Sequence, residues 1–296
     1  MRYNSDIFLQ VLNKKVDQKF RFSQLGLSNS TNAMTLSFLD DVKYIDQVNQ
    51  NENIMAVITN TKFVDKLNKQ YIVQSEDPRF DFYTLYNYLG KLEYIKTPSI
   101  IDKTVTIHPT AYVSEHNVKI GPNTVIYPNV TILADVEIGA DCIVQSGTII
   151  GSEGFEYKKT QRGILGVFHD GKVIIKDKVH IGANNCIDKG FSIRNTIIEE
   201  EVKIDNLIHV AHGVHIKRGA FIIAGTILGG SSTIDEEAWI SINTSIAPGL
   251  VVGKHGFVSM GAVVTKSVPD NAQVTGNFAI PHDQFINDLK NRTKKN

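Results

Sequence analysis

The sequence predicts a mainly β protein: a left-handed parallel β-helix of hexapeptide repeats, preceded by a small α/β domain and followed by a short C-terminal helix. Two observations support this fold class. Aliphatic residues recur every six positions from about residue 107 onward, and residues 1–100 lack this repeat. A period of six fits neither the 3.6-residue turn of an α-helix nor the two-residue alternation of a half-buried strand. It is the period of a β-helix in which three hexapeptides form one coil of about eighteen residues.

The repeat falls into two blocks. The first has aliphatic residues at Ile120, Ile126, Ile132, Ile138, Val144 and Ile150. The second continues without a slip through Ile198, Ile204, Val210, Ile216, Ile222, Leu228, Ile234, Ile240, Ile246, Val252, Val258 and Val264. Inward-facing residues one coil apart should stack, which predicts one apolar column of Ile198, Ile216, Ile234 and Val252. Glycines are expected at corners that need unusual backbone angles: Gly121, Gly139, Gly182, Gly213, Gly219, Gly225, Gly249 and Gly261.

Two interruptions break the rhythm. The repeat stops after Ile150 and resumes at Ile175, which predicts an excursion loop over residues 151–174. A loop of this length inside a compact solenoid is usually functional. A one-residue slip between Ile193 and Ile198 indicates a local irregularity at a corner.

Three domains are expected. Residues 1–100 form the small α/β domain, residues 101–276 form the β-helix, and residues 277–296 form a polar helical tail. In the first domain, residue patterns predict strands over Ile54–Asn60 and Tyr71–Ser75, a short helix over Lys62–Lys69, and a helix over Pro78–Gly90 that has proline in its first turn.

Composition excludes several classes of function. The chain has 296 residues, 31 Lys and Arg against 31 Asp and Glu, and only two cysteines. A net charge of zero argues against nucleic acid as a partner, because such proteins concentrate cations on one face. Two cysteines make no disulfide framework, and the first thirty residues lack the apolar core of a signal peptide. We therefore expect a cytoplasmic protein, and the lack of a long apolar run predicts that it is not an integral membrane protein.

The most distinctive polar cluster places His209, His212 and His215 within seven residues. One interpretation is that all three are solvated surface histidines. A metal site would need the imidazoles to converge on one point. His209 and His215 hold the same place in successive hexapeptides, so they lie on successive faces and diverge within one chain. We therefore expect no metal site, unless one forms across a subunit interface.

General-base catalysis needs only one neutral imidazole. His212 is the best placed of the three, because it precedes Gly213 and lies one coil from Gly230. With no side chain at Gly230, an acyl donor could approach the backbone closely, and the amide there could donate to an oxyanion.

Four segments resemble one enzyme family. They are CIDKGFSIRNTIIEEEVKIDNLIHVAHGVHI, GSEGFEY at the start of the excursion loop, SMGAVVTKSV, and TLSFLDDVKY in the first domain. Together they resemble the motifs of UDP-3-O-acylglucosamine N-acyltransferase, the lipid A enzyme family. The KIDN and AH elements are the most specific of these motifs.

This resemblance implies roles for particular residues. His212 would be the catalytic base, and the Gly230 amide would occupy the oxyanion position. The substrate-binding residues would be Phe38 and Tyr44, which would hold the uracil or thymine base, Asp205 and Asn206 in the acceptor pocket, His209, and Phe155 of the excursion loop. An ordinary core aromatic is the alternative interpretation of Phe38. The family also implies a homotrimer whose active site lies between neighbouring subunits.

Two departures from the family pattern affect the predicted substrates. Glu156 stands where the family has glycine, and the C-terminal helical extension is short. That extension helps to engage acyl carrier protein in the family, so acyl-CoA becomes an alternative donor. We predict an N-acyltransferase that acylates the amine of a nucleotide-linked amino sugar for a surface polysaccharide. Its co-substrate would be acyl-CoA or acyl carrier protein, with no resident cofactor.

Three alternatives remain open. The first is UDP-3-O-(3-hydroxyacyl)glucosamine N-acyltransferase of lipid A biosynthesis itself. The others are a zinc enzyme like the β-helical carbonic anhydrases and a solenoid without catalytic activity, such as an ice-binding protein. An ice binder needs a flat face of repeated threonines, and no face of this repeat provides one.

Overall fold

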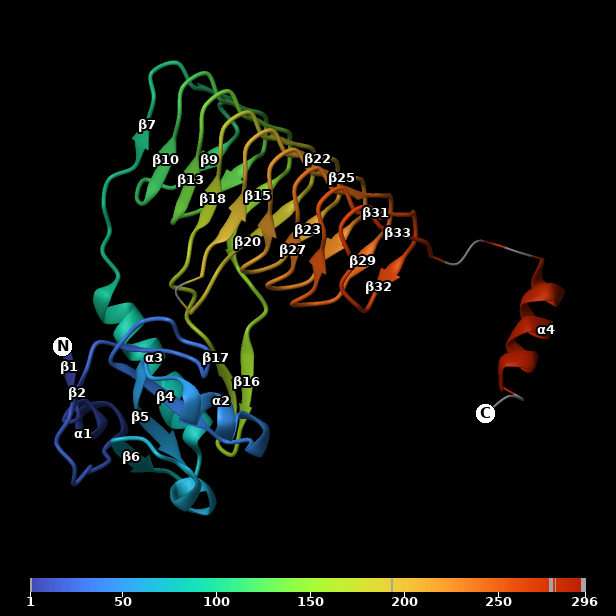
Figure 1. Cartoon of the computed structure of the whole chain (residues 1–296). Coiled ribbons are helices and arrows are strands. Elements are labelled where there is room, and N and C mark those ends of the chain that lie inside the picture. Colours follow the sequence, from blue (N-terminus) through green and yellow to red (C-terminus); the bar gives the residue numbers. More distant parts are fainter. Residues whose placement is uncertain (1, 193, 277–278, 280, 294–296) are drawn as a thin grey trace.

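A computed structural model describes residues 2–192, 194–276, 279 and 281–293, and shows a stack of coils beside a smaller α/β region (Figure 1). The coil strands form three parallel sheets of eight, nine and eight strands, each sheet being one face of the stack. Partners in a sheet lie one coil apart, as Ile198 pairs with Ile216. The predicted β-helix is therefore confirmed.

The strands are short because each face is only one hexapeptide wide. The first face contains β7 Ile100–Ile101, β10 Val118–Ile120, β13 Val136–Ile138, β18 Val173–Ile175, β21 Thr196–Ile198, β24 His215–Ile216, β27 Thr233–Ile234 and β30 Val251–Val252. The second contains β8 Thr106–Ile107, β11 Val125–Ile126, β14 Ile143–Val144, β19 His180–Ile181, β22 Lys203–Ile204, β25 Phe221–Ile222, β28 Trp239–Ile240, β31 Phe257–Val258 and β33 Gln273–Val274. The third contains β9 Tyr112–Val113, β12 Thr131–Ile132, β15 Ile149–Glu153, β20 Cys186–Lys189, β23 His209–Val210, β26 Ile227–Leu228, β29 Ser245–Ile246 and β32 Val263–Val264.

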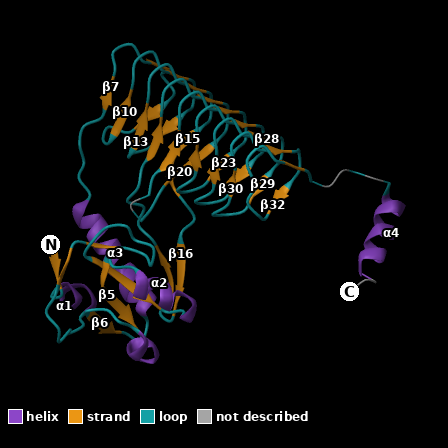
Figure 2. Ribbon diagram, in the orientation of Figure 1, coloured by secondary structure: helices purple, strands orange, loops and turns teal. Residues whose placement is uncertain are grey.

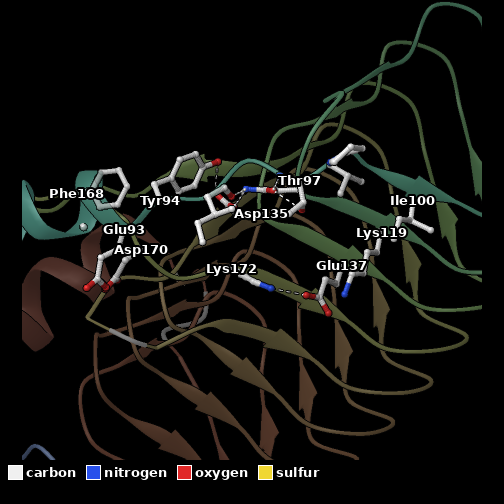
Figure 3. Close-up of a pocket in the computed structure, with 15 residues that line it drawn as sticks. Glu93, Tyr94, Thr97, Ile100, Lys119, Asp135, Glu137, Phe168, Asp170 and Lys172 are labelled. Carbon is white, nitrogen blue, oxygen red and sulfur yellow. Dashed lines mark hydrogen bonds and ion pairs between the residues drawn. The ribbon is translucent and has the colours of Figure 1, made fainter. Parts of the chain in front are cut away.

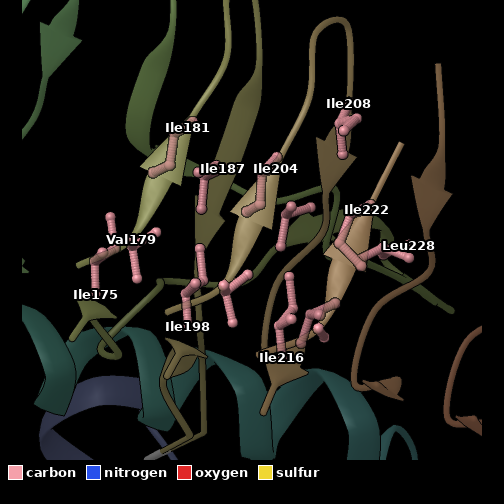
Figure 4. Packing of buried hydrophobic residues seen from close by; sticks show 14 of the residues in the cluster. Ile175, Val179, Ile181, Ile187, Ile198, Ile204, Ile208, Ile216, Ile222 and Leu228 are labelled. Atoms are coloured by element: carbon pink, nitrogen blue, oxygen red, sulfur yellow. The ribbon is translucent and has the colours of Figure 1, made fainter. Parts of the chain in front are cut away.

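The interior of the stack is a continuous aliphatic core. In a typical strand of two residues the first side chain faces outward and the second faces inward. The predicted column is fully buried, with no exposed area at Ile198, Ile216, Ile234 and Val252. Figure 4 shows the packing of neighbouring members of this core, among them Ile204 and Ile222. Burying one such side chain contributes about 1.5–3 kcal/mol, so the repeated aliphatic position is the main source of stability.

The corners differ in part from the sequence prediction. Five of the predicted glycines have φ near +70°: Gly213, Gly219, Gly225, Gly249 and Gly261. The prediction is wrong for Gly121, Gly139 and Gly182, which do not have positive φ. Glycine is needed at these three corners because a Cβ would collide with the next coil, at 2.7 Å from a backbone atom in the case of Gly121. At many other corners Asn or Asp takes the left-handed conformation, as Asn123 does at φ 59°.

The excursion loop contains an antiparallel hairpin of β16 (Tyr157–Thr160) and β17 (Gly163–Gly166). The hairpin leaves the coils and extends toward the α/β region (Figure 1). The stack continues without a gap beneath it, because Val136 pairs directly with Val173. The insertion therefore adds residues without breaking the ladder of strands.

The predicted one-residue slip is wrong, because the structure has a second insertion at this place. Val173 pairs with Thr196, 23 positions further on, where a regular coil has 18. Five residues are therefore added between β20 and β21. In a period of six, adding five residues looks the same as losing one, which explains the wrong interpretation. Ile193, where the slip was placed, lies outside the described residues.

The α/β region is built around a parallel sheet in the order β3-β4-β5-β6 (Figure 2). The sequence predicted its later elements correctly, except that the short helix is a 3₁₀ helix. Its elements are β1 Tyr3–Asn4, α1 Ile7–Leu12, β2 Arg21–Phe22, β3 Gln24–Leu25, β4 Thr35–Leu39, η1 Val42–Tyr44, α2 Ile45–Gln50, β5 Ile54–Thr59, η2 Thr61–Lys66, β6 Tyr71–Gln74 and α3 Pro78–Glu93.

Both insertions pack against this region. Val167 and Phe191 are buried in its apolar core, together with Phe82 and Leu85 of α3. The Ser192 N–H, from the second insertion, donates to the Tyr86 hydroxyl at 2.7 Å. The α/β region and the coils are thus joined through the two inserted segments as well as through the chain after α3.

The last described element is α4 (His282–Thr293), which agrees with the expected C-terminal helix. Parts of the predicted tail, residues 277–278, 280 and 294–296, lie outside the described residues. None of the helices that the structure describes is both long and apolar enough to cross a membrane.

Candidate active site

His212 lies in the turn after β23, and its side chain is 17% exposed. Two aromatic rings from the inserted segments enclose it. The Phe191 ring centre lies 5.1 Å from that of His212, and the His169 ring centre lies 6.4 Å away. Part of the surroundings of His212 is therefore built by segments that do not belong to the repeat.

Glu156, at the base of the hairpin, is the charged neighbour of His212. Its Oε2 lies 3.6 Å from His212 Nε2, and its carboxylate also forms an ion pair with Lys158. His212 Nδ1 is buried without a hydrogen-bond partner among the described residues. Nε2 is therefore the ring nitrogen that faces the polar side of the site.

The pKa of His212 is lowered, principally by burial, while the charge of Glu156 opposes this effect. Burial wins because it penalises the charged imidazolium. A lowered pKa keeps the ring neutral near pH 7, which is the form that accepts a proton.

Both ring nitrogens of His169 form hydrogen bonds with the backbone. Its Nε2 accepts a hydrogen bond from the Gly154 N–H at 3.1 Å, and its Nδ1 lies 3.0 Å from the Val167 carbonyl, to which it donates. Both ring nitrogens are thus used to hold the start and the end of the excursion loop together. Burial lowers its pKa as well. We assign His169 to loop positioning.

Gly230 lies directly against the His212 ring, one coil further along. A Cβ at this position would come within 2.5 Å of His212 Cε1 and 2.6 Å of Nε2. No described residue accepts a hydrogen bond from the Gly230 N–H. The structure therefore brings together the two residues that the sequence selected as base and oxyanion donor.

Phe38 and Tyr44 line one cavity of about 460 Å³ in the α/β region, together with Arg79, Tyr83 and Lys158. Tyr44 is 41% exposed. Phe38 also packs on Phe82 and Tyr83, with ring centres 4.7 and 5.6 Å away, so it supports the core as well.

Lys158 connects this cavity to His212. Its ammonium group lies 5.0 Å from the centre of the Tyr83 ring and pairs with Glu156, the neighbour of His212. Two ion pairs therefore link the lining of the cavity to the histidine.

Three of the other predicted substrate-binding residues lie outside this cavity, while His209 lies on β23, shortly before His212. Phe155 is 87% exposed and packs only on Tyr157 among the ring contacts of the described residues. Asp205 and Asn206 line a different cavity, of about 420 Å³. Asn206 Oδ1 accepts from the Ala183 N–H at 2.6 Å, so within one chain this side chain holds a corner of the stack.

Another cavity, of about 780 Å³, is separate from this site (Figure 3). It lies between the end of α3 and the first coils, where Tyr94 faces Phe168 and Lys172 pairs with Glu137 at 2.7 Å. None of the residues selected from the sequence lines it.

Comparisons with known proteins identify the repeat. Residues 117–152 match the family described as bacterial transferase hexapeptide (six repeats). The coils within this segment carry this hexapeptide repeat. The chain is also 35% identical over 147 residues to UDP-3-O-acylglucosamine N-acyltransferase of Methylobacterium sp. (strain 4-46), which covers 50% of this chain and 42% of the relative. The enzyme of the same name from Wolinella succinogenes is 31% identical, over 51% of this chain and 49% of that relative.

This chain thus spans less than half the length of these two curated relatives. Both relatives are named acyltransferases. Among solved structures, the UDP-N-acetylglucosamine acyltransferase from Campylobacter jejuni superposes with a TM-score of 0.52 at 21% identity. This match covers 60% of this chain and 70% of that one. At this identity the likeness supports the left-handed β-helical fold alone.

Among the residues of the site that were not selected from the sequence as site residues are Glu156, Lys158 and Phe191. Glu156 gave a signal, because it replaces a glycine of the resembled motif. Lys158 and Phe191 gave none, since they lie in insertions that follow no repeat.

Proposed function

We propose that this protein is an N-acyltransferase that moves an acyl group from a thioester to the amine of a UDP-linked amino sugar. The observation that carries the proposal is the half-buried, neutral His212 beside Gly230, joined through Lys158 to an aromatic and cationic cavity. The names of the relatives favour UDP-3-O-acylglucosamine as acceptor over an amino sugar of a surface polysaccharide.

In the proposed reaction His212 Nε2 takes the proton of the attacking amine. The amine nitrogen bonds to the thioester carbonyl carbon, and the oxyanion that forms accepts a hydrogen bond from the Gly230 N–H. The carbon–sulfur bond then breaks, and the proton passes from His212 to the departing thiolate. The products are an amide and a free thiol, and the step needs no resident cofactor.

The cavity in the α/β region suits the nucleotide. Tyr44 and Phe38 offer aromatic surface to a base, while Arg79 and Lys158 offer cations to a diphosphate. Acyl carrier protein and acyl-CoA both remain candidate donors. We also propose the homotrimer, in which Phe155, Asp205, Asn206 and His209 would meet substrate at the boundary between subunits.

Product analysis tests this proposal. The chain would be mixed with UDP-3-O-acylglucosamine, or with other UDP- or dTDP-linked amino sugars, and with either acyl-CoA or hydroxyacyl carrier protein. We expect one UDP acceptor to gain the mass of one acyl group while an equal amount of thiol is released. Failure of every pair to react would contradict the assignment as an acyltransferase.

Replacing Tyr44 with alanine should weaken binding of the nucleotide sugar by roughly 1–3 kcal/mol, the contribution of one aromatic stacking partner. The increase should appear in KM, with kcat changed much less. Tyr44 is preferable to Phe38 for this test because Phe38 also packs in the core. Tyr127→Ala, which removes an exposed tyrosine of the coils, is the control. If Tyr44→Ala has the same KM as the parent protein, the nucleotide binds elsewhere.

Replacing Glu156 with glutamine should move the acidic limb of the kcat/KM profile to lower pH. The Glu156 carboxylate raises the pKa of His212, so removing its charge lowers that pKa further. His212 then stays neutral, and active as a base, to a lower pH. Glu199→Gln is the matched control, since Glu199 contacts His215 on the first face. A limb that stays in place, or moves to higher pH, would show that His212 does not set it.

A further inference from the structure

Three side chains of different chemistry converge on the third face, next to His212. Cys186 on β20 and His209 on β23 are paired neighbours in the ladder, and Asp188 lies two residues after Cys186. Their ligand atoms all lie within 4.8 Å of one another. Cys186 Sγ is 3.6 Å from Asp188 Oδ1, and His209 Nε2 is 3.7 Å from Asp188 Oδ2.

The two separations that involve Asp188 are close to those of a tetrahedral zinc site, one for each carboxylate oxygen, and Cys186 and His209 lie within 4.8 Å of each other. Bond lengths of about 2.0–2.3 Å to nitrogen, oxygen and sulfur place the ligand atoms about 3.3–3.7 Å apart. The carboxylate is already oriented, because Ser152 donates a hydrogen bond to Asp188 Oδ1 at 2.8 Å. Asp188 is only 5% exposed, and its partner among the described ion pairs is His209.

We propose that Cys186, Asp188 and His209 bind one Zn²⁺ ion, with a fourth coordination position open to water or a ligand. Thiolate and imidazole favour zinc over magnesium or calcium, which prefer oxygen ligands. On binding, the sulfur–zinc bond forms and the thiol proton leaves to solvent. The thiolate and the carboxylate then balance the two charges of the ion.

This site differs from the one considered from the sequence, which involved only histidines. His215 lies on the first face and pairs with Glu199 at 2.6 Å, so it takes no part. The ligands of the proposed site come from two neighbouring coils, and Cys186 and His209 share a register although 23 residues separate them. The proposal does not depend on acyl transfer.

Cobalt spectroscopy tests the site in the full chain. Protein freed of metal by a chelator would be titrated with Co²⁺ and, separately, with Zn²⁺. We expect one ion per chain, a near-ultraviolet thiolate-to-cobalt charge-transfer band, and a rise in Tm with zinc. Cys186→Ser should abolish the band, and His209→Ala should weaken zinc binding at least about tenfold.

Two control variants should leave metal binding unchanged. Cys142→Ser removes the other cysteine, which is buried, and His215→Ala removes a nearby histidine. Circular dichroism establishes that each variant is folded. Persistence of the band in Cys186→Ser, its loss in Cys142→Ser, or no binding at one equivalent of metal would overturn the proposal.

Discussion

Replacing His212 with alanine is expected to lower kcat by about 10²–10⁴-fold and to leave KM nearly unchanged. The attacking amine must lose a proton, and His212 is a neutral imidazole held between Phe191 and Gly230. Alanine removes the proton acceptor without disturbing the ladder, because the ring is not part of the aliphatic core. Steady-state kinetics with the acceptor identified by product analysis measures the effect.

His215→Ala is the matched control, since it removes a histidine of the first face and should retain parent kcat. His209→Ala should lower kcat less than His212→Ala does. The reason is that the His209 side chain extends from the third face toward Asp188. If His212→Ala stays within about tenfold of the parent and its pH profile follows the sugar amine, positioning alone drives the reaction and the general-base role is wrong.

Replacing Gly230 with alanine is expected to lower kcat by about 10²-fold, the scale of a displacement of about 1 Å in a reacting group. The new Cβ would lie 2.5 Å from His212 Cε1, so the imidazole must move. A side-chain ring gives way more easily than the stacked backbone, and we therefore expect the variant to fold. Kinetics and thermal unfolding, measured together, separate loss of activity from loss of stability.

Gly166→Ala controls for the added methyl group, since its Cβ would make only an ordinary contact of 3.4 Å with Tyr157. Parent activity in Gly230→Ala would mean that His212 tolerates displacement and that an open backbone at this coil is not required. A combined loss of activity and of the folded state would instead assign Gly230 to packing.

The coils could be predicted from the sequence because every hexapeptide repeats the same burial pattern. The first half of the α/β region could not. Strand β4 (Thr35–Leu39) is buried on both sides, so it lacks alternation, and α1 and α2 have only six residues each. Elements this short show no reliable period.

Some residues of the candidate site could likewise be predicted from the sequence, and others could not. His212 and Gly230 could be selected because the repeat fixes which residues lie one coil apart. The contacts of Glu156, Lys158 and Phe191 could not, because the path of each insertion depends on its packing against α3. The cluster of Cys186 and His209 escaped prediction for a related reason: the inserted residues after β20 disguised their register.

The uninterrupted ladder beneath the hairpin has a consequence for how this fold can vary. Val136 and Val173 pair as directly as residues of a regular coil, so the hairpin is anchored at two fixed points. Lengthening a loop between fixed ends costs little, about 0.6 kcal/mol per doubling. Natural variation can therefore rebuild the segment that carries Glu156 and Lys158 while the histidine stays in place. If the proposed function holds, substrate range could change through the hairpin while the general base is kept.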